Sequence, residues 1–237
     1  MHAFANPARF LKLARPLTPW CLGLGLALIG YGIYAGFQSP PDAVQGETVR
    51  ILYIHVPTAW LGMLGWMGIA LTSLMLLVWR HPLAAVAARA IAVPGALFTA
   101  VCLISGSIWG RPTWGTWWQW DGRMTSMLLL LFLYLAYIAL AGSESETSST
   151  ERVAAIFGLV GAVNLPVIHY SVVWWNTLHQ PPSLSLQGSA IAWPILWPLL
   201  WTTPGFTLLF AGIVLMRMRT LIAENKKLAR MRRLARA

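Results

Sequence analysis

Five tryptophans crowd into one short stretch of the sequence, SIWGRPTWGTWWQWDGR, which runs from Ser107 to Arg123. Aromatic rings at this density can stack on a large, flat, apolar ligand, each contributing about 0.5–1.5 kcal/mol beyond its buried area. We expect the helix breakers Gly110, Pro112 and Gly115 to interrupt the stretch and to shape it into a loop. The tryptophans are Trp109, Trp114, Trp117, Trp118 and Trp120.

Two histidines accompany this stretch and have the chemistry of metal ligands. His55 lies in YIHVPTAW and His179 in NTLHQPPS, and a proline that stiffens the backbone follows each two residues later. Zinc usually requires three or four Cys, His or carboxylate ligands, whereas two neutral imidazoles suit the two axial faces of haem iron. Haem is also a flat, apolar surface of the kind that a tryptophan cluster favours. The pair therefore predicts a haem site, although a single histidine beside a membrane is more often a hydrogen-bonding residue.

The composition indicates the elements that must position these residues. Hydrophobic residues make up 57% of the 237 and charged residues 10%, against about 25% charged in soluble domains. Because about 20 apolar residues cross a bilayer as a helix, we predict an all-α membrane protein with six transmembrane helices in a single domain, residues 1–237. The predicted helices cover about 17–37, 56–79, 84–108, 124–142, 153–174 and 195–216.

The distribution of basic residues predicts the orientation of these helices. With both termini in the cytoplasm, 14 of the 17 Lys and Arg residues lie on the cytoplasmic side, as the positive-inside rule requires. Only Arg50, Arg111 and Arg123 remain on the other side, in three outer loops at about 38–55, 109–123 and 175–194. The net charge of +10 follows from this topology, so it does not indicate nucleic-acid binding.

The tryptophans also have a simpler explanation, the aromatic belt that forms at both membrane interfaces. Of the fourteen, only Trp20 and Trp79 map to the inner edge, and the other twelve map to the outer side. A belt gives no reason for this imbalance, which favours a ligand site in the outer loops. Asp121 belongs to the same loop. The three outer arginines are the available partners for the haem propionates.

Other residues with chemical potential have smaller predicted roles. Cys21 and Cys102 map to opposite membrane edges, too far apart for a disulfide. The chain lacks a C-x-x-C-H motif, so the predicted cofactor is non-covalent haem b. His169 lies inside the fifth helix, about 9 Å below Trp175, and is either a third ligand or, as we favour, a hydrogen-bonded core residue.

Two cytoplasmic segments complete the predicted organisation. GSESETSSTER, between the fourth and fifth helices, has the composition of a solvated connector. The tail 217–237 is basic and carries Leu221, Leu228, Met231 and Leu234 partly on one face. This pattern is typical of an interfacial helix that contacts anionic lipid, and docking of a cytoplasmic partner subunit is the alternative.

At these residues the chain resembles a known family, the CcmC proteins (haem exporter protein C), which are tryptophan-rich haem-handling proteins of bacterial cytochrome c maturation. The resemblance rests on WGRPTWGTWWQWDGRMTS, RILYIHVPTAW and HYSVVWWNTLHQPPS, and it covers essentially the whole chain. It implies an inner-membrane protein with its site facing the periplasm. It also implies that His55 and His179 are axial haem ligands, and that the loop from Trp109 to Asp121 holds haem and meets a soluble chaperone.

The resemblance implies partners and an activity as well. The partners are the periplasmic haem chaperone (maturation protein E), the ATPase and permease components of an ATP-binding-cassette transporter (maturation proteins A and B), and a small single-helix component (maturation protein D). The implied function is delivery of haem to the chaperone, and we do not expect an enzyme, although the protein could assist the bond that forms between haem and chaperone. The alternatives are a haem permease and a b-type electron carrier.

Overall fold

Helical spans make up most of the part of the chain that the structure describes. The computed structural model describes residues 6–142, 148–175, 177–179, 183–185 and 188–235. Within them, six segments are long and apolar enough to cross a membrane, which confirms the predicted all-α membrane class. The elements are α1 (Pro7–Gln38), the 3-10 helix η1 (Glu47–Ile51), α2 (Leu52–Trp79), α3 (Ala84–Trp114), α4 (Gly122–Ala141), α5 (Ser148–Gly161), α6 (Asn164–Trp174), the short hairpin β1 (Leu184–Ser185) and β2 (Gly188–Ser189), and α7 (Trp193–Leu234).

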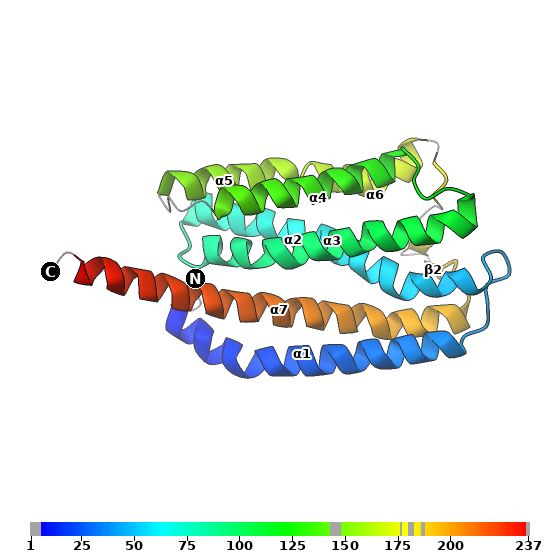
Figure 1. The fold of residues 1–237 in the computed structure, drawn as a ribbon, viewed down its shortest axis with the longest axis horizontal. Helices are drawn as coiled ribbons and strands as arrows, with labels where there is room; N and C mark the ends of the chain where they lie inside the picture. Colours follow the sequence, from blue (N-terminus) through cyan, green and yellow to red (C-terminus); the bar gives the residue numbers. More distant parts are fainter. Residues whose placement is uncertain (1–5, 143–147, 176, 180–182, 186–187, 236–237) are drawn as a thin grey trace.

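The helices are arranged as a bundle of α2 to α6 with a separate pair, α1 and α7, along one side (Figure 1). The pair is held closely together through glycines, since a side chain at Gly25, Gly32 or Gly205 would overlap the backbone of the opposite helix. Small residues of this kind let transmembrane helices approach each other. Most contacts between this pair and the bundle are those of α7 with α2 and α3. The position of α1 relative to the bundle therefore depends mainly on α7.

The core of the bundle forms around Trp66, a fully buried residue of α2. Its ring packs edge-on against Tyr134 and Tyr137 of α4 and Phe157 of α5. Trp66 is one of the twelve tryptophans that the sequence maps to the outer side, but the structure buries it in the middle of α2, where it faces the other helices rather than a membrane interface. Four aromatic rings from three helices thus meet in the core of the bundle.

The bundle has two different ends. Both termini lie at one end, which we call the terminus end, and α7 continues beyond the other helices there (Figure 1). The opposite end, where α1, α3 and α6 finish at Gln38, Trp114 and Trp174, is called the loop end. The two predicted ligand histidines lie near the loop end.

Several predicted boundaries are wrong. The first helix begins at Pro7, the second is preceded directly by η1 and already includes His55, and the sixth continues to Leu234 instead of ending near residue 216. The fifth span breaks between Gly161 and Asn164, because Pro166 has no N–H to donate to the carbonyl of Ala162. The connector 143–147 lies outside the described residues.

The third helix shows why a breaker residue does not always end a helix. α3 passes through Gly110 and Pro112 and stops only at Gly115, whose φ of +79° gives the left-handed cap that glycine adopts freely. Pro112 has no N–H to donate to the carbonyl of Ile108, but the helix continues for two more residues despite this lost hydrogen bond. Trp109 and Trp114 are therefore helical, and the true loop is limited to residues 115–121.

Candidate functional site

His55 lies in the first turns of α2 and faces α3. Its Nδ1 is 3.1 Å from the carbonyl oxygen of Cys102 and 3.1 Å from Oγ of Ser105. The Ser105 hydroxyl donates its own proton to the carbonyl of Val101, so both neighbours of Nδ1 are acceptors. Nδ1 must then carry the proton, which leaves the lone pair of the neutral ring on Nε2.

The α2–α3 contact leaves little freedom for this ring. A side chain at Gly106 would approach Cε1 of His55 to 2.9 Å, so glycine is needed where the imidazole crosses α3. Trp109, one turn further along α3, packs edge-on against the ring with 5.6 Å between centroids. Trp109 also donates to Gln45 at 2.8 Å and so connects the loop after α1 to this site.

His179 lies in the segment between α6 and α7 and is held by a carboxylate. Its Nδ1 is 2.6 Å from Oδ2 of Asp121, the residue that caps the N-terminus of α4. Asp121 Oδ1 accepts a hydrogen bond from the backbone N–H of Met124, and Thr177 donates its hydroxyl proton to Oδ2. Because a carboxylate accepts, Nδ1 of His179 carries the proton and Nε2 keeps its lone pair.

The electrostatics of this pair favour a neutral imidazole beside an ionised carboxylate. Burial lowers the pKa of His179 below its ordinary 6.5, aided by the charge of Arg123, although Asp121 opposes the shift. Burial alone would raise the pKa of Asp121, but hydrogen bonds from Thr177, Met124 and His179 outweigh it and lower that pKa. At neutral pH, His179 is therefore in the form that can bind a metal.

Arg123, in the first turn of α4, lies close enough to both histidines for its charge to act on them. Its charge interacts with both His55 and His179, and the two imidazoles interact with each other. Its guanidinium donates to the carbonyl of His169 at 3.3 Å. Asp121, two residues before Arg123, makes no ion pair with it among the described salt bridges and pairs with His179 instead.

The tryptophans of the stretch divide into two groups. Trp109 and Trp114 are half-buried on α3, and Trp114 packs edge-on against His179 with 4.6 Å between ring centroids. Trp117 and Trp120 lie in the loop with 58% and 75% of their surface exposed, and Trp118 lies between them with its indole N–H buried and unpaired within the described part of the chain. The first group packs on the two histidines, and the second presents aromatic surface outward.

The other two predicted propionate partners are held by neighbouring residues. Arg50, on η1, pairs with Glu47 at 2.5 Å, donates to the carbonyl of Ser39 and lies over the ring of Phe37. Arg111 is exposed and donates to the carbonyl of Gly115, which reinforces the end of α3. Of the three arginines, Arg123 is the one that the structure connects to the histidines.

His169 is not the core residue that we expected. It is exposed on α6, and its ring contacts Tyr170 with 4.7 Å between centroids. The expectation was wrong because helical depth says nothing about which face a residue occupies. Sequence reasoning also missed Thr177, Ser105 and Gly106, whose roles depend on contacts between residues far apart in the chain.

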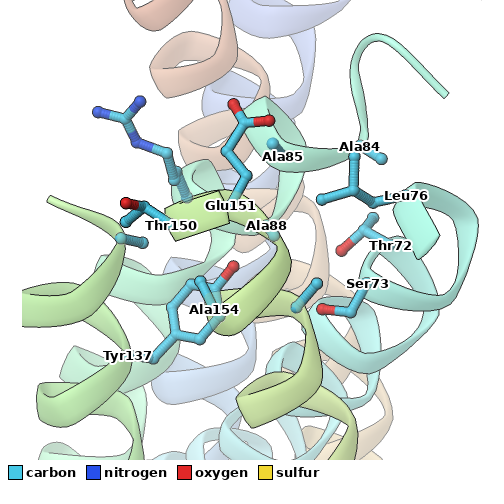
Figure 2. Close-up of a pocket in the computed structure, with 13 residues that line it drawn as sticks. Thr72, Ser73, Leu76, Ala84, Ala85, Ala88, Tyr137, Thr150, Glu151 and Ala154 are labelled. Atoms are coloured by element: carbon cyan, nitrogen blue, oxygen red, sulfur yellow. The ribbon is translucent and has the colours of Figure 1, made fainter. Parts of the chain in front are cut away.

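A cavity at the terminus end is too small to hold an organic ligand. It lies between α2, α3, α4 and α5, with Thr72, Ser73, Tyr137 and Glu151 among its lining residues (Figure 2). Oγ of Ser73 is buried there and has no hydrogen-bond partner among the described residues. The volume of about 30 Å³ admits water but no organic ligand.

The loop end therefore provides two imidazoles, and on each of them Nδ1 is held by hydrogen-bond acceptors. Both rings use Nδ1 for their hydrogen bonds, and in the part of the chain that the structure describes Nε2 makes none on either ring. A histidine that binds a metal usually donates its other N–H to a carbonyl or carboxylate in this way. These donors suit haem iron, and the surrounding tryptophans suit its porphyrin.

Fold and site together define a class, the six-span helical membrane proteins with a histidine and tryptophan site at one end of the bundle. The sequence profile described as heme exporter protein C matches residues 1–233, and the chain belongs to this family. Heme exporter protein C of Bradyrhizobium diazoefficiens is 48% identical over 94% of this chain and 85% of its own length. The proteins of the same name from Escherichia coli (43% identical; 96% of this chain, 92% of its own) and Paracoccus denitrificans (40%; 99% and 98%) are similar along nearly their full lengths.

Proposed function

We propose that this protein binds non-covalent haem b at the loop end of the bundle and passes it to a partner protein during cytochrome c biogenesis. His55 and His179 bind the iron through Nε2, and Arg123 neutralises a propionate. The relatives are named for haem export, which supports haem as the substrate. The observation that carries the proposal is the shared use of Nδ1 by both rings, because it leaves two iron-binding nitrogens at the same end of the molecule.

The surrounding residues suit a site that must also release its ligand. Imidazole ligands on iron can be exchanged, and aromatic packing contributes only about 0.5–1.5 kcal/mol per ring. Trp117 and Trp120 are largely exposed, so they form a surface on which a second protein can reach the haem. This partner is the periplasmic haem chaperone in our proposal. The protein acts by positioning haem and partner, a contribution that can be large without any catalytic side chain.

The proposed setting is the bacterial inner membrane, with the loop end in the periplasm. The excess of Lys and Arg near the terminus end supports this orientation. The name of the relatives supports membership of an exporter complex of the ATP-binding-cassette type, with ATPase, permease and single-helix components as the proposed partners.

The visible absorption spectrum of the purified protein with haem tests the ligands. We expect a low-spin spectrum with two histidine ligands in the wild type, and loss of that spectrum in both His55→Ala and His179→Ala. His169→Ala is the matched control, because His169 is an exposed histidine outside the site, and it should keep the wild-type spectrum. An unchanged spectrum in either ligand variant would reject the assignment.

A further inference from the structure

Basic side chains converge at the terminus end, far from the haem site. Lys12 and Arg15 from α1 and Lys226 from α7 line one open groove of about 330 Å³. The remaining lining residues are Ala8 and Leu11. The groove thus combines an apolar floor with three cations that come from opposite ends of the sequence.

Packing at the beginning of α1 brings these cations together. Pro16 and Pro19 lie inside α1, and the segment before them bends toward α7 (Figure 1). Phe10 and Leu11 pack there against the apolar cluster that includes Met218 and Ile222 of α7. This contact places the first turns of α1 beside Lys226, which lies one turn beyond Ile222.

The three cations have no counter-charge among the residues that the structure describes. Lys12, Arg15 and Lys226 are exposed, and none of them makes an ion pair in the part of the chain that the structure describes. Glu224 is two residues from Lys226, which places it about 160° away around the helix. Because like charges repel, an anion bound in the groove would stabilise this arrangement.

The position of the groove relative to the membrane surface indicates which anion is available to it. Trp20, also on α1, is 75% exposed, as expected of a tryptophan at a membrane interface. Arg15 and Lys12 follow about 7.5 and 12 Å further along the helix axis. Head groups add about 5–8 Å to each side of the hydrocarbon, so Arg15 lies at the level of the phosphates and Lys12 lies just outside them, within reach of its long side chain.

We propose that this groove binds the head group of an anionic phospholipid. Lys12, Arg15 and Lys226 contact its phosphate. The lipid bridges the start of α1 to α7, so it supports the pair of helices that packs beside the bundle. The basic residues further along α7 lie beyond the groove and have no part in this site.

The test is lipid retention by the full-length protein in nanodiscs that contain phosphatidylglycerol and phosphatidylcholine, measured by native mass spectrometry. We expect the wild type to retain phosphatidylglycerol selectively. The triple variant Lys12→Gln, Arg15→Gln, Lys226→Gln should bind it on the order of 100-fold more weakly, because each basic residue contributes about fivefold at an anionic surface.

The matched control removes the same charge elsewhere on α7. The triple variant Arg230→Gln, Arg232→Gln, Arg233→Gln lies outside the groove and should retain phosphatidylglycerol as the wild type does. Equal losses in both triple variants, or no lipid preference in the wild type, would overturn the proposal. Thermal unfolding checks that the variants are folded, and if the groove variant is not, Lys226→Gln alone should show a loss of about fivefold.

Discussion

At the scale of single residues, the site depends on which nitrogen of each histidine carries the proton. Cys102 and Ser105 fix it on Nδ1 of His55, and Asp121 fixes it on Nδ1 of His179. The partners differ in charge, because one ring donates to a carbonyl and a hydroxyl and the other donates to a carboxylate. A carboxylate makes the imidazole a stronger donor to a metal, so His179 should be the stronger of the two ligands.

Asp121→Asn tests this role of the carboxylate. Asparagine also caps helices well, so α4 should keep its stability, while the affinity for haem should fall about 10–100-fold, as for other residues that orient a metal ligand. Asp121 raises the pKa of His179 against the effect of burial, so its removal should lower that pKa further below 6.5. Haem titration and NMR titration of the histidine in the haem-free protein measure the two effects.

Asp121→Ala is the companion variant, because it removes both the cap and the partner of His179. It should lose about 1 kcal/mol of stability in addition to the same loss of affinity, and an unfolding experiment separates it from the asparagine variant. Unchanged haem affinity in Asp121→Asn, or a rise in the pKa of His179, would contradict a positioning role for this carboxylate.

Residue types and spacing were enough to select His55, His179 and Asp121 as members of one candidate site. They were not enough to pair Asp121 with His179, which lies 58 residues away, in place of Arg123, which lies two residues away. That pairing depends on where α4 begins and on how the segment after α6 returns to it. Contacts of this range come from tertiary packing, and a single sequence does not record them.

At the scale of helices, apolar length predicts how many spans exist but not where they end. α3 and α7 both extend beyond their predicted ends, because hydropathy falls at the membrane surface while helical hydrogen bonding continues. The extra turns of α3 have a consequence for the site. They place Trp109 beside His55 and Trp114 beside His179 on one rigid element.

The contact between α1 and α7 leads to a prediction about stability. In Gly205→Ala, the new Cβ would lie 2.8 Å from the backbone nitrogen of Ile29, which cannot rotate away, so we expect destabilisation of about 1–3 kcal/mol. Gly30→Ala is the control, since nothing lies within 4 Å of that position and alanine favours the helix. Unfolding in detergent should separate the two variants, and equal stabilities would show that the helices are not in close contact at Gly205.

At the scale of the whole molecule, the two ends of the bundle differ in composition and in chemistry. The loop end carries the histidines and most exposed tryptophans of the stretch, whereas the terminus end carries the cationic groove and the protruding part of α7. The proposed haem site at one end and the charged surface at the other suit the proposed orientation, in which the two ends face different compartments. The excess of Lys and Arg at the terminus end was predictable from the sequence, because the positions of these residues depend on membrane topology rather than on packing.

The orientation of the bundle can be measured directly with single cysteines. After Cys21 and Cys102 are replaced by alanine, Val44→Cys and Leu234→Cys place one thiol at each end, at positions that are 91% and 68% exposed. The positive-inside rule predicts that a membrane-impermeant maleimide added to the periplasm labels Val44→Cys and labels Leu234→Cys only after the inner membrane is opened. The opposite pattern would place the histidines and their tryptophans in the cytoplasm, where a periplasmic chaperone could not reach them.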